Sequence, residues 1–484
     1  MSEEETKTSA KKKEKPAPKE RTVTTRHSVT IAGQKIPYTA TAGTLFLRDA
    51  EGEPRAEVFY VAYSRDVDDP ASRPVTFAFN GGPGSSAVWL HLGALGPRRV
   101  EAKDALPSAP PPNRVVDNEH SILDVTDLVF IDPVGTGWSR PLGETKAKEF
   151  HTVKDDVTSV GEFIQRWTSR NGRWSSPRYV MGESYGTTRA ASLAAHLGEH
   201  GVMINGVALI SAALMFQTLI FETGNDLPHV LYLPAFAATA AFHGKLAEPR
   251  DDLQAFLREV ETFAIEEYGP ALMLGASLPE TRRDLLAERL GAMTGLDPAL
   301  WRRSELRIEL GRFCRELLRE EGEIVGRLDS RFRGLLAADS DDPGERDPSF
   351  YFPYGPYASA IQDYLRRELG FDEERNYEVI SFSVNETWSW SDDKSKRFGY
   401  INAASDLRRA MVQNPHLSVL FASGVYDLAT PYFASMHTAR HVGREVAIRK
   451  NIRESFYDAG HMMYLHPPSR AKLRDDLVVL ITGS

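Results

Sequence analysis

Ser184 stands between two glycines in the pentapeptide GESYG, residues 182–186. A strand-type run, RYVM, leads into it, and an alanine-rich, helix-forming run follows at once. A strand, a sharp turn and a helix present a serine as a nucleophile, and the flanking glycines are needed because larger residues would clash in the turn. The five-residue pattern alone also occurs in ordinary tight turns, so it is the context that predicts a nucleophilic Ser184.

A serine hydroxyl becomes reactive only beside a general base that an acid orients. After a serine on such a turn, the acid and then the base follow along the chain. Asp427 comes directly after the buried run SVLFASGVY, and His461 follows a glycine at the end of ESFYDAG. Both therefore lie just beyond predicted strands, and the sequence predicts a triad of Ser184, Asp427 and His461.

Three other residues compete for the roles of acid and base. Asp132 also ends a predicted strand, but it precedes the serine. Asp458 lies too close in sequence to His461 to be its favoured partner. His466 is the nearest rival base, but two prolines follow it, which indicates that it caps the last helix.

A glycine-rich stretch, NGGPGSS at 80–86, follows the predicted buried strand PVTFAF. Consecutive glycines let a backbone N–H group approach a substrate oxygen, and in this type of site one oxyanion donor comes from a loop after an early strand. We expect the second donor to follow the nucleophile directly. The predicted oxyanion hole consists of the N–H groups of Gly82 and Tyr185; the alternative is a plain Gly-Pro turn.

Buried runs alternate with helical stretches in the first part of the chain, which predicts an α/β fold with a mostly parallel central sheet and helices on both faces. The sequence then becomes charged and amphipathic, which predicts an inserted, mainly helical cap. Strand and turn patterns return after it. The expected organisation is a disordered N-terminal tail (1–25), a first core segment (26–212), the cap insertion (213–395) and a second core segment (396–484).

The composition excludes several classes of partner. With 58 Lys and Arg against 67 Asp and Glu, the formal net charge of −9 favours neither nucleic acid nor an anionic membrane. The least polar long run, 202–221, contains polar interruptions and predicts a strand and a helix start rather than a membrane span. The single cysteine, Cys314, excludes an intrachain disulfide and lies in a helical apolar pattern, as core residues do.

The sequence also bears on location and cofactors. The N-terminus lacks the apolar stretch of a secretory signal, so we expect a cytoplasmic protein, with an exported form still open if the N-terminus is processed or truncated. No His/Cys cluster has metal-ligand spacing, and we expect no metal and no cofactor. The oligomeric state stays open.

The core segments resemble the serine carboxypeptidases, peptidase family S10, and most closely their bacterial branch. The resemblance runs over about 55–240 and 380–475 and rests, in this order, on NGGPGSS, LGP (95–97), DPVGTGWS, GESYG, YDLATP and GHMMYLHPP. Membership would imply an α/β-hydrolase fold with an inserted cap, a peptide substrate with a free C-terminus, and release of its last residue by the same triad. It would also assign Asn80, Gly81 and Glu183 to binding the substrate's terminal carboxylate, with Glu183 acting as a neutral acid.

The chain departs from the better-known members of that family. They are secreted and disulfide-bonded, and they carry a glutamate directly before the Leu-Gly-Pro as a second acid for the carboxylate; this chain has Ala94 there. An esterase or an acyltransferase with the same triad is therefore an alternative. A catalytically silent binding protein on this fold is a further one, although the intact triad argues against it.

The predicted cap contains the aromatic stretch FYFPYGPY (350–357) and the pair Trp388 and Trp390. These residues, Tyr351 and Tyr354 among them, would line the substrate cleft if the cap covers the site. The alternative is that they only pack the cap onto the core, which is the commoner role for any single aromatic residue.

Overall fold

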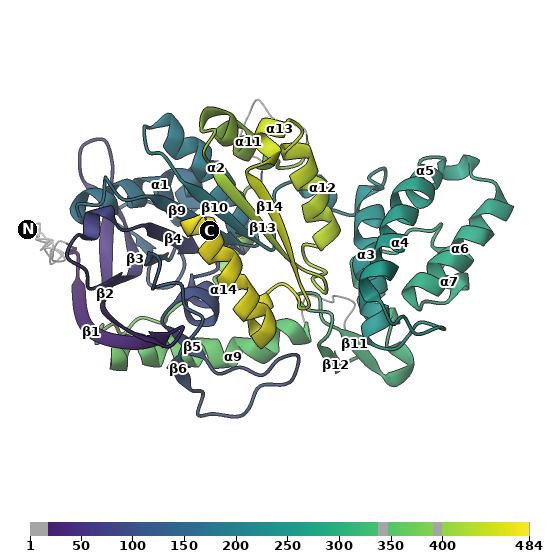
Figure 1. Ribbon diagram of the computed structural model, residues 1–484, viewed down its shortest axis with the longest axis horizontal. Coiled ribbons are helices and arrows are strands. Elements are labelled where there is room, and N and C mark those ends of the chain that lie inside the picture. The colour runs from purple at the N-terminus through teal and green to yellow at the C-terminus, as the bar shows by residue number, and fades with distance from the viewer. Residues whose placement is uncertain (1–17, 337–346, 391–398, 484) are drawn as a thin grey trace, which may run out of the picture.

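A ten-stranded sheet forms the centre of the computed structural model, which describes residues 18–336, 347–390 and 399–483. Its order is β1-β2-β3-β7-β4-β9-β10-β13-β14, with β8 paired to β3 (Figure 1). The strands are β1 (Thr22–Ile31), β2 (Gln34–Arg48), β3 (Pro54–Arg65), β4 (Val75–Phe79), β7 (Asp127–Ile131), β8 (Arg140–Pro141), β9 (Arg178–Glu183), β10 (Gly206–Ile210), β13 (Ser418–Gly424) and β14 (Ile452–Tyr457). The first three strands pair antiparallel, and the six from β7 to β14 along the sheet are parallel. The mixed, mostly parallel sheet confirms the predicted α/β class.

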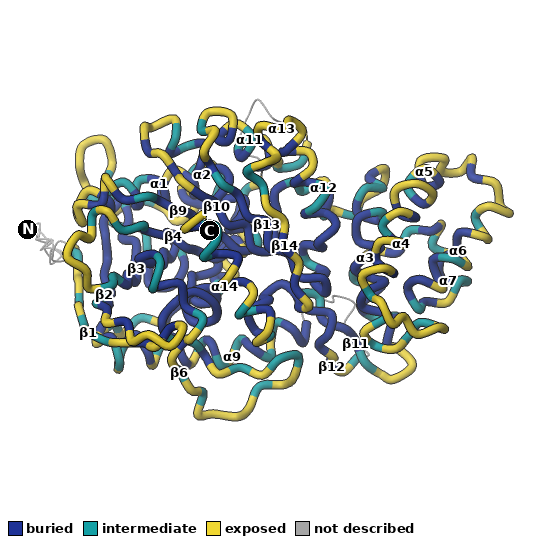
Figure 2. The backbone as a smooth tube through the Cα atoms, in the orientation of Figure 1, coloured by how far each residue is buried: buried dark blue, intermediate teal, exposed yellow. Residues whose placement is uncertain are grey.

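Helices cover both faces of the parallel strands. Neighbouring residues of β9 point to opposite faces, so Val180 belongs to the apolar core on one face and Met181 to the core on the other. The first core includes residues of α1 (Val153–Arg170), α2 (Tyr185–Glu199), α11 (Ala404–Gln413) and α12 (Tyr432–Val442); the second includes α9 (Pro348–Asp363) and α14 (Pro467–Thr482). Because both faces are covered, β4, β7, β9 and β10 are buried along their whole length. Figure 2 shows the region of β4, β9 and β10 in the dark blue of buried residues.

A helical lobe projects beyond α12 and has an apolar core of its own (Figure 1). It consists of α3 (Leu227–Phe242), α4 (Leu253–Phe263), α5 (Gly269–Leu272), α6 (Glu280–Thr294), α7 (Pro298–Arg303) and α8 (Leu310–Glu316). The first turn of α12 contributes Tyr432 and Phe433 to this core, which joins the lobe to the sheet domain. Cys314 is buried in it, and burial raises the pKa of its thiol, as expected of a core residue.

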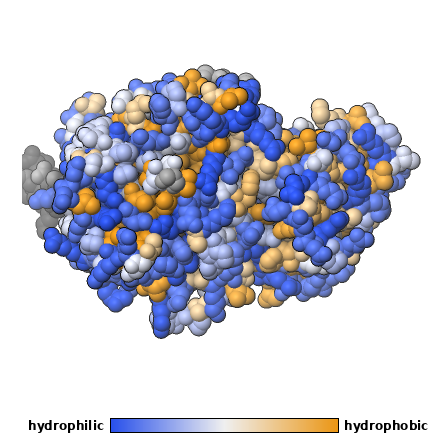
Figure 3. Space-filling model, viewed as in Figure 1, coloured by the Kyte–Doolittle hydropathy of each residue, from blue (hydrophilic) through white to orange (hydrophobic). Residues whose placement is uncertain are grey.

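Shorter elements complete the chain. They are the strands β5 (Arg98–Val100), β6 (Val115–Asp117), β11 (Glu323–Val325) and β12 (Arg333–Leu335), the helices α10 (Phe382–Thr387) and α13 (Val446–Arg449), the 3₁₀ helices η1 (Pro70–Ser72), η3 (Ala147–Phe150), η4 (Phe216–Thr218), η6 (Gly275–Ser277), η7 (Arg319–Glu321) and η9 (Met463–Leu465), and the π-helices η2 (Leu90–Leu95), η5 (Ala264–Tyr268) and η8 (Tyr364–Glu368). The weakly polar run 202–221 forms β10 and η4, as predicted. Of the helices described, none is both long and apolar enough to span a membrane. The face seen in Figure 3 is mostly hydrophilic, with small scattered apolar areas.

The predicted disordered tail, 1–25, extends too far along the chain. Residues 1–17 lie outside the described residues, but β1 begins at Thr22. This strand pairs with β2 in unbroken register from Thr22 opposite Gly43 to Ile31 opposite Gln34. Backbone pairing with a long neighbouring strand orders residues whose side chains bury little, which a prediction from apolar content alone misses.

The predicted cap, 213–395, is not one body. Its first part forms the helical lobe, but α9 and the segment after it pack onto the sheet domain. Tyr357, Tyr364 and Val379 all belong to the apolar core that lies under α14. The aromatic side chains of this segment bury apolar surface against the sheet domain, which favours this placement.

Candidate active site

Ser184 occupies the turn between β9 and α2 in a conformation that side-chain-bearing residues rarely adopt. Its φ is 59° and its ψ is −130°. The turn is fixed because the Ser184 N–H donates to the Ile210 carbonyl at 3.0 Å and the Ser184 carbonyl accepts from the Thr187 N–H at 2.8 Å. Strain of this kind is kept only where the surroundings enforce it, and it projects the hydroxyl away from the strand.

Glycines let the turn pack directly against the NGGPGSS loop. A Cβ atom on Gly182 would collide with the carbonyl of Gly186, which is backbone and cannot move aside as a flexible side chain can. A Cβ atom on Gly81 would lie 2.5 Å from the Tyr185 nitrogen. Gly81 is thus needed for the close approach of the two loops, and its predicted contact with a substrate carboxylate stays a prediction.

Asp427 and His461 follow β13 and β14, the two strands at the far edge of the parallel sheet. Nδ1 of His461 lies 2.7 Å from Oδ2 of Asp427, and both side chains are buried. The carboxylate is held by the N–H groups of Ala429 (2.8 Å) and Thr430 (2.9 Å) and by the Thr430 hydroxyl (2.7 Å). Because a carboxylate only accepts hydrogen bonds, Nδ1 carries a proton and Nε2 of the neutral ring is left to accept one.

The protonated form of His461 is stabilised where it lies. Burial alone lowers the pKa of the imidazole, but the charge and hydrogen bond of Asp427, with a contribution from Glu183, outweigh it and raise the pKa above its ordinary value. An imidazole in this setting can take up a proton from a nearby hydroxyl.

The end of β10 ties the serine turn to the histidine loop. Ile210 accepts the hydrogen bond from Ser184, and the next residue, Ser211, donates its hydroxyl to the His461 carbonyl at 2.7 Å. The last residue of β10 and the residue after it thus anchor the segments of the predicted nucleophile and the predicted base. A serine turn after one parallel strand, with acid and base after later strands of the same sheet, is the arrangement of the α/β-hydrolase fold, as predicted.

The two predicted oxyanion donors lie on the two loops that meet at the serine. Gly82 has a φ of 102°, and no group in the described part of the chain accepts a hydrogen bond from its N–H. Tyr185 is the first residue of α2 and directly follows Ser184. The role of both N–H groups as oxyanion donors stays a prediction.

Glu183 is buried and directly precedes Ser184, with 3% of its surface exposed. It accepts a hydrogen bond from the Tyr464 hydroxyl at 2.8 Å, and the side chain of Asn80 also bonds to it. Burial raises the pKa of Glu183 to about 7, against the opposing effects of His461 and Tyr464. A carboxyl group with this pKa is neutral under mildly acidic conditions, as the predicted binding of a carboxylate requires. Ala94 is buried in η2 and supplies no second acid.

The sequence did not predict the buried ion pair between Asp156 and Arg189 behind the serine turn. Arg189 Nε donates to Asp156 at 2.8 Å, and the Tyr185 hydroxyl donates to the same oxygen at 2.9 Å. Nη1 of Arg189 reaches the Asn80 carbonyl at 2.6 Å. The pair therefore links α1, α2 and the NGGPGSS loop. In sequence, both residues look like ordinary polar positions of exposed helix faces.

The sequence also did not predict a supporting loop between β11 and β12, residues 327–331, which we call the brace loop. The carbonyl of Arg327 accepts a hydrogen bond from the N–H group of Leu428, the residue after Asp427, at 3.1 Å. The carbonyl of Leu328 accepts one from the N–H group of His461 at 2.6 Å. The Asp329 carboxylate accepts the Gly460 N–H at 3.0 Å. One loop of the insertion thus touches the segments that carry both the predicted acid and the predicted base.

We expect Gly460→Ala to lower kcat/KM on an activated ester at least 100-fold, because the added methyl group would lie 2.5 Å from Asp329 Cα and must displace the brace loop or His461. The matched control is Gly355→Ala in α9, where the new methyl group meets nothing within 4 Å. Steady-state kinetics and thermal melting of both variants check this. Full activity of Gly460→Ala would show that the brace loop does not position the base.

The aromatic residues predicted to line the cleft divide into two groups. The Trp388 and Trp390 rings lie 5.2 and 5.8 Å from the Tyr185 ring, next to the serine. The Tyr351 hydroxyl instead approaches Gly334 in β12, and Tyr354 packs near Phe350 within the same helix. A cleft role stays a prediction for the two tryptophans and the two tyrosines, and Tyr354 also packs against the apolar core of the sheet domain.

No group of three or more His, Cys, Asp or Glu side chains in residues 18–336, 347–390 and 399–483 is arranged to hold a metal ion. The described groups include a histidine paired with a carboxylate, and proton transfer to that histidine from Ser184 stays a prediction.

Comparison with known proteins gives a partial match. Residues 34–209 match the family model described as serine carboxypeptidase, peptidase S10. The chain is 27% identical to serine carboxypeptidase-like 12 of Arabidopsis thaliana over 155 residues (31% of this chain, 33% of the relative), and 27% identical to serine carboxypeptidase-like 45 of the same plant over 173 residues (34% of each). The chain thus spans about a third of the length of the curated relatives it matches.

Solved structures are similar over most of the chain but at low scores. A proline iminopeptidase from Mycobacterium smegmatis has a TM-score of 0.39 and 13% identity, with 91% of this chain and 98% of that chain covered. A putative aryl esterase from Burkholderia cenocepacia has a TM-score of 0.40 and 12% identity, with 91% and 99% covered.

Proposed function

Since the chain is related, through residues 34–209, to the serine carboxypeptidases of peptidase family S10, we propose that it is a serine-type carboxypeptidase that releases the C-terminal residue of peptides. The observation that carries the proposal is the buried Glu183 carboxyl group between the serine turn and the Asp427–His461 pair. We also assign the chain to the bacterial branch of the family, a placement that its single cysteine supports and that the plant relatives do not test.

The reaction follows from the roles of the three triad residues. His461 Nε2 takes the proton of the Ser184 hydroxyl as its oxygen attacks the scissile carbonyl carbon, and Asp427 stabilises the imidazolium that forms. The N–H groups of Gly82 and Tyr185 stabilise the tetrahedral oxyanion, each contributing roughly 3 kcal/mol to the lowering of the barrier. His461 then donates its proton to the leaving amine. Water, activated by the same imidazole, hydrolyses the acyl-enzyme on Ser184.

Glu183 would select the C-terminus of the substrate. Two ionised carboxylates in one buried site repel each other, so the substrate's carboxylate binds best when Glu183 is protonated and donates a hydrogen bond. Asn80 holds the Glu183 side chain from the neighbouring loop. Because Glu183 directly precedes Ser184, a carboxylate bound there would place the last peptide bond near the nucleophile.

We expect kcat/KM for a peptide with a free C-terminus to fall as pH rises through about 7, because Glu183 ionises there. On the acid side activity should also fall, because His461, whose pKa is raised, must be neutral to act as a base. Glu183→Gln keeps a neutral donor at every pH and should flatten the alkaline decline. The measurement is the pH profile of kcat/KM for both proteins on free-acid and amidated peptides. A wild type that cleaves the two peptides equally at every pH would contradict the carboxylate site.

The second candidate is an esterase or an acyltransferase with the same triad. The observation that favours it is the buried Ala94 at the position where the resemblance leads one to expect a second acid. Product analysis with an added amine or alcohol acceptor separates the two activities, because an acyltransferase forms the acceptor conjugate in preference to the free acid.

A further inference from the structure

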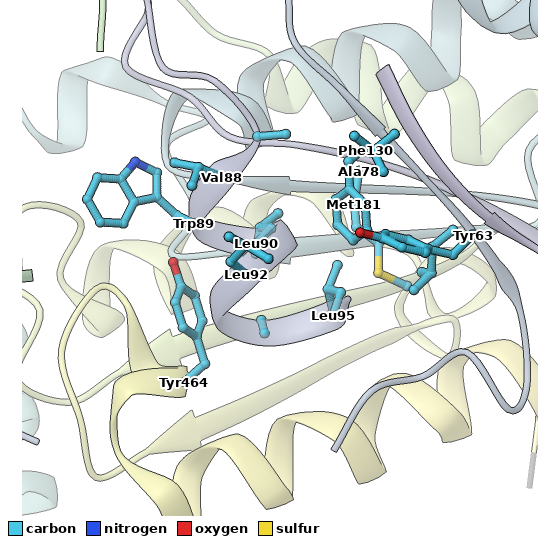
Figure 4. Packing of buried hydrophobic residues seen from close by; sticks show 14 of the residues in the cluster. Tyr63, Ala78, Val88, Trp89, Leu90, Leu92, Leu95, Phe130, Met181 and Tyr464 are labelled. Atoms are coloured by element: carbon cyan, nitrogen blue, oxygen red, sulfur yellow. The ribbon is translucent and has the colours of Figure 1, made fainter. Parts of the chain in front are cut away.

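Aromatic rings, rather than a second carboxyl group, fill the space beside Glu183. Tyr464 is fully buried on η9, three residues after the histidine, and its hydroxyl donates to Glu183 Oε2 at 2.8 Å. In Figure 4 its ring points from the segment before α14 toward the turn that carries Trp89 and Leu92. The contact joins residues 281 positions apart in the sequence.

The ring of Tyr464 lies over the residue that precedes Ala94. A Cβ atom on Gly93 would lie 2.5 Å from Cε2 of Tyr464 and 2.8 Å from the Tyr357 hydroxyl. Gly93 is therefore required for both rings to pack against η2. Ala94 itself is buried and has no side-chain hydrogen-bonding group, whereas the Tyr464 phenol donates to Glu183.

We propose that Tyr464 determines the specificity of the carboxylate site, with its phenol taking the place of the missing second acid and orienting the Glu183 carboxyl group. This inference rests on the proposed function. The phenol donates one hydrogen bond to Oε2 of Glu183, and the side chain of Asn80 bonds to the same carboxyl group.

A phenol and a carboxylic acid in this place differ in how they respond to pH. Burial raises the pKa of Tyr464 well above 10, so the hydroxyl stays a donor through the working range. Glu183 then titrates as the one acid of the carboxylate site, instead of sharing a proton with a second acid. The titratable groups that face it are His461 and Asp427 from the triad loops, Tyr464 from η9 and Tyr357 from α9.

The hydrogen bond from the Tyr464 hydroxyl stabilises the ionised form of Glu183 more than the neutral form, so it lowers the pKa of Glu183. In Tyr464→Phe the pKa of Glu183 should rise, so the alkaline limit of kcat/KM for a free-acid peptide should move to higher pH. At acidic pH the free-acid peptide should be cleaved about tenfold more slowly, through a higher KM, because the carboxyl group is no longer oriented. Hydrolysis of a neutral activated ester should be slowed much less than hydrolysis of the free-acid peptide.

The control is Tyr357→Phe, which loses a hydroxyl from the neighbouring ring but no hydrogen bond to Glu183 among the described contacts. Tyr357→Phe should leave the alkaline limit of kcat/KM for the free-acid peptide unchanged.

A second variant carries 3,5-difluorotyrosine at position 464, whose phenol is more acidic and a stronger hydrogen-bond donor. It should move the alkaline limit of kcat/KM to lower pH. This variant tests the inference even if Tyr464→Phe does not fold.

Three results would overturn the inference. If the wild type prefers the free acid but both Tyr464 variants keep its alkaline limit, Tyr464 is only a packing residue and the proposed carboxypeptidase stands. If Tyr464→Phe slows the ester and the free-acid peptide equally, its role is structural. A wild type without any preference for the free acid refutes the proposed function and this inference together.

Discussion

Ser184→Ala should lower kcat about 10⁶-fold on any substrate that the wild type hydrolyses. The alanine removes the only atom that forms the acyl bond, whereas the turn around it is held by backbone hydrogen bonds that alanine also makes. The fold should therefore persist, and the residual rate should come from the oxyanion donors and substrate binding.

A fluorophosphonate probe checks this directly, since it should label the wild type and not Ser184→Ala. The control is Ser28→Ala, at an exposed position of β1, which should be labelled like the wild type. Equal labelling of Ser184→Ala and the wild type would remove Ser184 from the mechanism and favour a binding protein on this fold.

Asp427→Asn should lower kcat about 10⁴-fold near neutral pH. The asparagine has the shape of the aspartate, but its amide group can donate to Nδ1 of His461, which stabilises the tautomer with the proton on Nε2. That tautomer cannot accept the proton of Ser184. The loss of the charge that raises the pKa of His461 also removes the stabilisation of the imidazolium.

The matched control is Asp458→Asn, because Asp458 is the rival acid in the sequence. The residue is exposed, and its backbone carbonyl accepts a hydrogen bond from Arg331. Its activity should stay within a factor of two of the wild type. If Asp427→Asn were nearly as active as the wild type and Asp458→Asn were not, the assignment of the acid would be wrong.

The parallel sheet and its covering helices could be predicted from the sequence, because they follow from the pattern of apolar residues along short segments. Buried runs alternating with helical stretches predict the parallel sheet, because strands covered on both faces have few polar positions. The same pattern predicts that Ser184, Asp427 and His461 lie close together, since the ends of parallel strands meet at one edge of the sheet. The structure pairs Asp427 with His461, and the catalytic roles of all three stay predictions.

The contacts that set the environment of the site could not be predicted in this way. The Tyr464–Glu183 bond, the Asp156–Arg189 pair and the brace loop each join segments far apart in sequence. No periodicity encodes them, because each depends on how whole elements pack. The same reason explains why the predicted cap divides between the helical lobe and a segment bound to the sheet domain.

The central claim is that the site recognises the free C-terminus of a peptide. The most direct measurement compares initial rates of hydrolysis of one blocked dipeptide with a free and with an amidated C-terminus, at mildly acidic pH where Glu183 is protonated. A carboxypeptidase should cleave the free acid faster and release its last amino acid as the product. Equal rates on the two peptides, or cleavage of the amide alone, would contradict the account.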